Sequence, residues 1–330
     1  TGTFSTRDVV IGREHFHDPR PCAPEFQHCR TQEEAYRTAR EMLREVIDYA
    51  HSRGIEIWIG KGDCPSVPSN LARHIQSARD AFFGLAMIPP HEPAGLEIWN
   101  TMLDAMVRDY PEADGYWLWL AEMYFRDDSP AAKAALAPYE KLHHLIPPVE
   151  DLRASGYDQY LEGMDDETLF EAEATALHYA RQLIGRAVER HPGTRWGVSV
   201  LGRSYLLPAL DAVLPAGVAL QSMEAAVCWN RSSRVPMENF GKVTGRDLYV
   251  MPRLDDDESE FAMQFNVGLH HHDRVISGSA EFGLAGAIPQ MGRTRGLEQN
   301  ARYIAEGGWD AALTPEPFYA RYVERIFGPA

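Results

Sequence analysis

Three carboxylate residues of this sequence follow runs of apolar residues that are typical of buried β-strands. Glu122 follows "GYWLWLA", Glu224 follows "GVALQSM", and Asp255 follows "DLYVMPRL". Apolar surroundings raise a carboxyl pKa by desolvation, whereas a neighbouring arginine lowers it. The sequence therefore offers carboxylates that can be held in different protonation states at the ends of neighbouring elements.

Two such carboxylates facing each other are what glycosidic bond cleavage requires. One donates a proton to the leaving oxygen, and the other acts as nucleophile or activates water. We predict Glu122 as the general acid, because an apolar run precedes it, and Glu224 or Asp255 as its partner. Glu122 can also be read as a strand-end carboxylate paired with a structural arginine. The run "DDDESE" that contains Asp255 is more often a solvated turn that caps a helix.

Other polar and aromatic residues follow the same apolar runs. Arginine binds carboxylates through its planar fork and also binds neutral sugar hydroxyls, so a substrate carboxylate is attractive without being required. Arg203 and Ser204 stand in the same kind of position after "TRWGVSVL". The residues predicted to bind substrate are Lys61, Asp63, Trp229, Arg231, Arg253, Arg293 and Arg295.

The elements that must position these residues alternate along the chain. Residues 31–54 predict a helix, with Thr31 as N-cap, Glu34 completing a capping box and Gly54 at the end. Strand patterns are found at 55–60, 115–120, 194–201, 217–223, 247–252 and 284–291. Helices are expected between and after them, over 94–110, 165–193, 204–215, 261–272, 295–309 and 314–327. In the strand at 115–120, Trp117 and Trp119 alternate with Leu118 and Leu120, so the two pairs should face opposite sides, as core.

Strands separated by helices imply parallel pairing. A doubly wound nucleotide-binding sheet should carry GxGxxG or GxxxxGK[ST] after an early strand, and neither occurs. We therefore predict a single (β/α)8 TIM barrel over residues 1–330, whose six recognisable strands are the third to the eighth. The first strands would lie in the irregular residues 1–30, where "DVVIG" is the candidate, or upstream. In such barrels the C-terminal strand ends open onto one cleft.

The composition excludes several classes of function. The 330 residues carry 32 Lys and Arg against 48 Asp and Glu, a net charge of −16 that repels nucleic acids and anionic membranes. No run approaches the roughly 20 apolar residues needed to span a bilayer, and the N-terminus lacks a signal-peptide pattern. We expect a soluble protein, with the choice between a cytoplasmic and a periplasmic or secreted location left open.

The cysteines and histidines do not predict a metal site or a cofactor. Cys22, Cys29, Cys64 and Cys228 lack zinc-ligand spacing, and a local disulfide between Cys22 and Cys29 and free thiols both remain open. Three consecutive histidines in "LHHHD" point about 100° apart on a helix and cannot converge on one ion. One of them can still line the cleft.

Three segments resemble glycoside hydrolases related to the α-glucuronidases. They are "VIDYAHSRGIEIWIG", "PEADGYWLWLAE" and "GRTRGLEQNARYIAEGGWDAALTPEPFYARYVERIFG". The resemblance implies a (β/α)8 catalytic domain without metal and a general acid after the fourth strand, which falls on Glu122. It implies a base after the sixth or seventh strand, matching Glu224 and Asp255 by position, and sugar-carboxylate recognition by Arg253, Arg293 or Arg295. The N-terminal β-domain and C-terminal helical extension of that family have no counterpart here.

These patterns together predict a glycosidase that removes a terminal sugar, with a uronic acid as one candidate, from a plant or algal oligosaccharide. Two alternatives remain at this stage. The chain can be a barrel that binds sugar without cleaving it, or a metal-dependent isomerase or hydrolase barrel. Retention or inversion at the anomeric carbon depends on a carboxylate separation that no sequence spacing gives, and the oligomeric state is equally open.

Overall fold

The computed structural model describes most of the chain from Phe26 to Pro329. The described residues are 26, 28–75, 78–80, 85–120, 125–155, 157, 161, 163–223, 237–252, 254, 269–289 and 298–329. Of residues 63, 69, 70, 79, 80, 223 and 269–272 only the backbone is described.

The centre of the molecule is a six-stranded parallel sheet in which every strand pairs with its predecessor. Its strands, in spatial and chain order, are β1 (Trp58–Cys64), β5 (Gly115–Leu120), β6 (Trp196–Leu201), β7 (Ala219–Met223), β8 (Leu248–Met251) and β9 (Gly286–Ala287). The strand order never reverses, whereas a doubly wound sheet reverses at its switch point. The fold is therefore α/β with a singly wound parallel sheet across the described residues.

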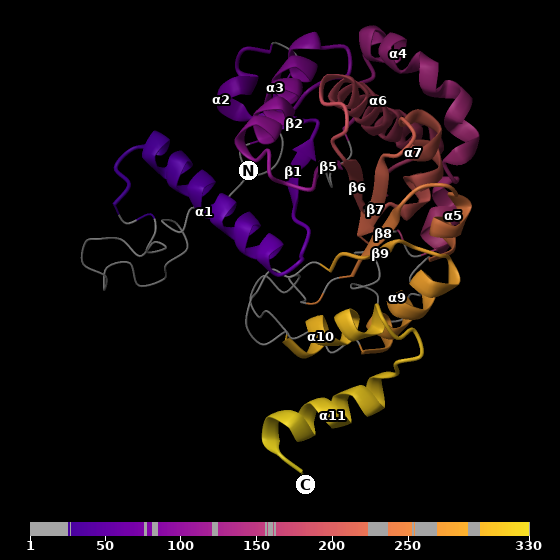
Figure 1. Ribbon diagram of the computed structural model, residues 1–330. Coiled ribbons are helices and arrows are strands. Elements are labelled where there is room, and N and C mark those ends of the chain that lie inside the picture. The colour runs from indigo at the N-terminus through magenta and orange to yellow at the C-terminus, as the bar shows by residue number, and fades with distance from the viewer. Residues whose placement is uncertain are drawn as a thin grey trace, which may run out of the picture.

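Helices connect these strands and cover one face of the sheet, as Figure 1 shows for α3, α6 and α7. The connecting helices are α3 (Pro93–Asp109), α6 (Asp166–Arg190), η6 (Ser204–Leu206) with α7 (Leu207–Val213), η7 (Met237–Lys242) and α9 (Leu269–Glu281). The helix-facing residues of β5 and β6 are Tyr116, Leu118, Val198 and Val200, all fully or almost fully buried in the main apolar core. Because successive side chains of a strand point to opposite faces, every second residue of β5 and β6 packs against the helices.

The opposite face of the sheet carries Trp117 and Trp119, as their alternation with Leu118 and Leu120 predicts. Trp117 contacts Tyr249 edge-on, with ring centroids 6.0 Å apart, although β6 and β7 lie between their strands. Their backbones would be about 14 Å apart in a flat sheet, so the sheet curls toward this face.

Gly197 makes the curled packing possible. A Cβ at Gly197 would lie 2.1 Å from the Trp117 ring, so no larger residue fits beneath the indole. The ring of Trp58 packs on the other side of Trp117, with centroids 5.1 Å apart. Large rings and glycines therefore complement each other on the inner face.

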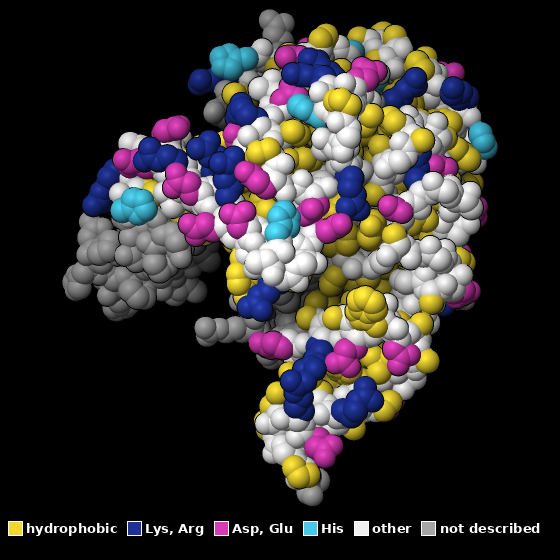
Figure 2. All heavy atoms as spheres, in the orientation of Figure 1, with side chains coloured by type: hydrophobic (Ala, Val, Ile, Leu, Met, Phe, Trp, Pro, Cys, Tyr) yellow, Lys and Arg dark blue, Asp and Glu magenta, His cyan; other side chains and the backbone are white. Residues whose placement is uncertain are grey.

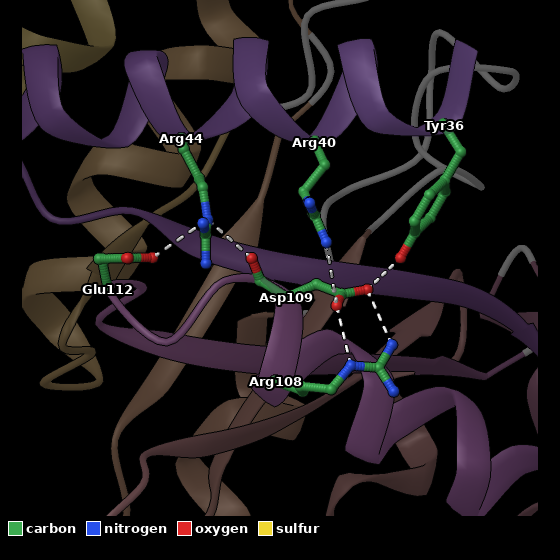
Figure 3. A network of polar contacts seen from close by, with 6 residues as sticks. All are labelled: Tyr36, Arg40, Arg44, Arg108, Asp109 and Glu112. Atoms are coloured by element: carbon green, nitrogen blue, oxygen red, sulfur yellow. Dashed lines mark hydrogen bonds and ion pairs between the residues drawn. The ribbon is translucent and has the colours of Figure 1, made fainter. Parts of the chain in front are cut away.

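The first helix, α1 (Gln32–Ser52), begins at the predicted capping box. Thr31 and Glu34 exchange side-chain-to-backbone hydrogen bonds at 3.1 and 3.0 Å. In Figure 1, α1 extends away from the helix-covered body of the sheet. Polar contacts connect it to the C-terminal end of α3 (Figure 3), and Ile47 and Ala50 are its buried residues.

Asp109, the last residue of α3, is the centre of that network (Figure 3). Arg108 donates two hydrogen bonds to its carboxylate, at 3.0 and 3.2 Å, and the Tyr36 hydroxyl donates a third from α1. Arg40 adds a longer ion pair at 4.0 Å, and Arg44 donates to the Asp109 carbonyl at 3.0 Å. The hydrogen bonds from Arg108 hold the pKa of Asp109 below its ordinary value, with Tyr36 assisting.

The predicted strand at residues 55–60 is wrong in its position, because β1 runs from Trp58 to Cys64 and so extends four residues past the expected end. Ile55 is exposed despite its β-branched side chain. Asp114 binds the Ile57 N–H through its carboxylate, at 2.7 Å, and fixes the point where pairing with β5 starts. Cross-strand pairing, rather than local composition, therefore sets the strand limits.

Of the other predicted helices and strands, some are confirmed and others differ from the structure in their end residues. The helix expected over 261–272 appears as α9 from Leu269, and residues 261–268 lie outside the described part of the chain. Of the strand expected at 284–291, the described residues 284–289 form β9 over Gly286–Ala287. The last two predicted helices are confirmed as α10 (Glu298–Gly307) and α11 (Pro315–Phe327), the latter preceded by Thr314 without a side-chain capping bond.

Two insertions between strands carry elements that the sequence patterns do not predict. After β1 comes a small antiparallel sheet of β2 (Ser66–Pro68), β3 (Arg79–Asp80) and β4 (Leu85–Met87), with the short helix α2 (Ser69–Ala72). After β5 come α4 (Pro130–Leu136), η4 (Ala137–Leu145) and α5 (Val149–Ala154). Both insertions follow the C-terminal end of a strand, where they add structure around the same edge of the sheet.

Candidate functional site

The C-terminal edge of the parallel sheet is the place to which the sequence assigns its candidate carboxylates. Glu122 follows the last residue of β5 by two positions, Glu224 directly follows β7, and Asp255 follows β8 by four. Parallel strands end at one edge, so β5, β7 and β8, which these residues follow in the sequence, all end at that edge. The placement of the three carboxylates themselves lies outside the described residues, as does that of Trp229, Arg231, Arg253, Arg293 and Arg295.

Lys61 is a predicted substrate-binding residue whose side chain is described. It pairs in register with Leu118 on the helix-facing side of the sheet. Its ammonium group lies 5.4 Å from the ring centroid of Trp99 on α3 and donates to the Gly62 carbonyl at 3.1 Å. The amine therefore points between sheet and helix. Only the backbone of Asp63 is described, within β1.

A buried ion pair lies just past the end of β6. Arg203 donates to Glu173 of α6 at 2.9 Å, and the Tyr205 hydroxyl donates to the second oxygen of the same carboxylate at 2.7 Å. Glu173 has no exposed surface, and Arg203 is 2% exposed. Burial raises the pKa of Glu173, while the Arg203 charge and the hydrogen bond from Tyr205 oppose the rise. A charged arginine is thus fixed at the strand end between the β5 and β7 exits.

A second set of buried hydrogen bonds holds the segment that follows. The Ser204 hydroxyl is 3.0 Å from the Tyr157 hydroxyl, and the Asn239 amide donates to Ser204 at 3.0 Å. Asn239 in turn accepts from Lys242 at 2.8 Å. These bonds connect segments far apart in sequence, so the backbone at the end of β6 is rigidly supported, as a site built on strand ends requires.

The inner face of the sheet forms an apolar floor below this edge. Leu201 and Met251 make a small buried cluster against Trp119, which is only half-buried. One pleat lower, Ser199 donates to the Gln221 side-chain oxygen at 2.5 Å. The Gln221 amide nitrogen is buried and has no hydrogen-bond partner among the described residues.

The described cavity at this edge is small. It is lined by Cys64, Met87, Phe125, Thr175, Arg203 and their neighbours, and its volume of about 10 Å³ is close to that of a single water. It is far below the roughly 300–1,000 Å³ of ordinary ligand sites.

Neither a metal centre nor a disulfide is found within the described part of the chain. No group of three or more His, Cys, Asp and Glu side chains there is arranged to hold a metal ion. The side chains of the histidine run at the start of α9 are outside that part. Cys29 and Cys64 are free thiols. Within the described ranges, no helix has the length and apolar character needed to cross a membrane.

Comparisons with known proteins add little to this picture. No protein family and no curated protein matches the sequence. A β-galactosidase from Rahnella sp. is a structural neighbour with a TM-score of 0.43 and 10% identity, over 86% of this chain. The chain spans about half of that protein, 47% of its length. Similarity at this level transfers neither the barrel nor the activity.

Proposed function

We propose that this chain is a glycoside hydrolase, with Glu122 as general acid and Glu224 or Asp255 as the second carboxylate. The observation that carries the proposal is the strand order. Because β5, β7 and β8 belong to one parallel sheet, we expect the three carboxylates that follow them to lie at the same edge. That edge also holds a fixed arginine and a half-buried tryptophan.

The sheet is proposed to be part of a (β/α)8 barrel. Its strands follow one another without reversal, its helices cover one face, and the rings of Trp117 and Tyr249 meet over the other. All three features are those of six consecutive strands of such a barrel. In this reading β1 is the third barrel strand and β9 the eighth, so Glu122 follows the fourth.

Strand spacing supports a carboxylate pair of the right separation. Neighbouring strands lie about 4.8 Å apart, so β5 and β7 are about 10 Å apart along the sheet. Curling and side-chain reach would bring groups that follow these strands into the window of about 5–9.5 Å that retaining and inverting glycosidases use. Asp255 follows β8, one strand farther from β5, and a more closed sheet would bring it equally near.

The protonation states follow from the surroundings of each strand end. Glu122 leaves the apolar strand β5, and desolvation there would keep it protonated, ready to donate to the glycosidic oxygen. The partner carboxylate would stay ionised beside the arginines of its own loop and attack the anomeric carbon or activate water. Arg253, Arg293 and Arg295 are the proposed ligands of a substrate carboxylate, which makes a terminal uronic acid and an α-glucuronidase-like activity the finer form of the proposal.

Glu122→Gln tests the general acid. We expect turnover to fall by about 10²- to 10⁴-fold on a glycoside with a poor leaving group, because a positioned acid contributes that much. An aryl glycoside with a good leaving group should lose far less, since it needs little protonation. Initial rates on both classes, with glucuronosyl and neutral sugars, give the measurement.

Glu224→Gln and Asp255→Asn, assayed alongside, identify the partner as the variant that loses activity on both leaving-group classes. Glu189→Gln, an exposed carboxylate on α6, is the matched control and should behave as wild type. Activity of Glu122→Gln within about tenfold of wild type on the poor leaving group would remove Glu122 from the proposal.

A further inference from the structure

The groove between α10 and α11 is a polar pocket that the proposed catalysis does not use. It has a volume of about 210 Å³ and is lined by Arg302, Glu306, Phe318, Arg321, Tyr322 and Arg325. Figure 2 shows Lys and Arg side chains interspersed with Asp and Glu side chains over this lower part of the molecule. The lining of the groove itself holds three arginines against one glutamate, in a chain of net charge −16.

Three guanidinium groups and one carboxylate line this groove. Arg302 donates to Glu306 at 2.8 Å, whereas Arg321 stays 3.9 Å away, beyond hydrogen-bonding distance. Arg325 makes no hydrogen bond or ion pair with the residues that the structure describes. The groove therefore holds excess positive charge and unused guanidinium donors, which are matched to the oxygens of a carboxylate or sulfate.

The groove also has an aromatic wall. Phe318 and Tyr322 are one turn apart on α11 and stack with centroids 6.1 Å apart and an interplanar angle of 22°. Phe318 is buried, while Tyr322 is partly exposed, and its hydroxyl has no hydrogen-bond partner among the described residues. The ring face of Tyr322 can pack against the C–H groups of a sugar, and the arginines can bind its acidic group. Glu306 can accept hydrogen bonds from its hydroxyls.

We propose that this groove binds one acidic sugar residue, carboxylated or sulfated, with Arg321 and Arg325 on the acidic group and Tyr322 against the ring. The volume is below the roughly 300–1,000 Å³ of sites for larger ligands, so it holds one ring rather than a chain. The site is a binding site separate from bond cleavage. It requires no turnover and stands whether or not Glu122 is a general acid.

Titration of the whole protein with sodium glucuronate, followed by calorimetry at constant ionic strength, tests the site. We expect saturable binding, weakened about tenfold or more in Arg325→Ala and in Arg321→Ala, because a charge-assisted hydrogen bond contributes at least that factor. Tyr322→Leu should weaken binding less, through the lost ring face. Arg37→Ala on α1, also exposed, is the matched control and should bind as wild type.

Further titrations distinguish the possible ligands from one another and this binding site from the proposed catalytic site. Glucose 6-sulfate should bind, glucose should not, and sodium sulfate should bind more weakly than either acidic sugar. Glu122→Gln should leave glucuronate binding in the groove unchanged. The proposal is overturned if no acidic sugar binds, if glucose or sulfate binds as tightly, or if a folded Arg321→Ala/Arg325→Ala variant keeps wild-type affinity, folding being checked by circular dichroism.

Discussion

Asp109 and Glu173 are two carboxylates with the same kinds of partner and opposite pKa shifts. Each accepts hydrogen bonds from an arginine and a tyrosine. The pKa of Asp109 is lowered, chiefly by the hydrogen bonds from Arg108, whereas burial raises the pKa of Glu173. The difference lies in the solvent around the partners, since the Arg108 side chain is 70% exposed and that of Arg203 only 3%.

Desolvation of the whole cluster, and not the number of partners, decides the direction in which the carboxyl pKa shifts. Asp109 belongs to a junction between helices that water still reaches (Figure 3). Glu173 lies against the strand ends where the catalytic groups are proposed. The same rule favours a raised pKa for a general acid at the end of the apolar strand β5.

Among the variants that test this difference, Arg203→Met is expected to lower the free energy of unfolding the most. It leaves Glu173 buried without its counter-charge, and removal of one partner of a buried pair costs about 3–5 kcal/mol. Urea denaturation followed by circular dichroism measures the loss. Arg108→Met, the exposed counterpart, should cost at most about 1 kcal/mol. Similar losses for the two variants would contradict the distinction, and Glu173→Leu/Arg203→Met should recover much of the stability.

His178, on the same helix as Glu173, shows burial without a counter-charge. Burial lowers its pKa to about 4 from an ordinary 6.5, so the native state favours the neutral ring. Stability from this group is present above pH 6.5 and is lost as the pH falls toward 4, by up to ~3 kcal/mol. Urea midpoints at pH 7, 5.5 and 4.5 measure it. His178→Leu should flatten this dependence, and an unchanged slope would contradict the assignment.

Asp109→Asn should have the smallest effect, about 1 kcal/mol, confined to the docking of α1. A lowered folded pKa means that the wild-type contribution is present above the ordinary value of 3.8 and is lost as the pH falls below it. Amide hydrogen exchange along α1 should therefore be faster in the variant at pH 7 only. Glu112→Gln, which removes the 3.7 Å pair with Arg44, is the control and should change exchange less.

Most of the sheet could be predicted from the sequence, because its strands are marked by local composition. "GYWLWL" is β5 to the residue, and Thr31 with Glu34 marks the start of α1. The limits of β1 could not be predicted, because they depend on Asp114 from the neighbouring strand connection. The strands β2 to β4 have two or three residues each, too few to show a period.

The candidate site was predictable only in part. Arg203 follows a strand pattern visibly, but its partner Glu173 lies within a helix. A signal for Glu173 does exist: the buried Leu169, Ala176 and Ala180 stand at positions −4, +3 and +7 from it, which places the carboxylate on the apolar stripe. A buried acid on such a stripe requires a cationic partner, but the sequence does not identify that partner. Lys61 faces the helices because it pairs with Leu118, and this pairing of β1 with β5 has no local signature in the sequence.

The uninterrupted order of the strands has a consequence for how the chain folds. Each strand of the parallel sheet pairs with the strand of that sheet synthesised before it, so the sheet can grow one unit at a time as the polypeptide leaves the ribosome. Pairing between successive units keeps the loops that must close short compared with the whole chain, which lowers the entropy lost before each new contact forms. A stalled or truncated product would then retain a paired N-terminal portion of the sheet, detectable as a protease-resistant fragment ending near a strand.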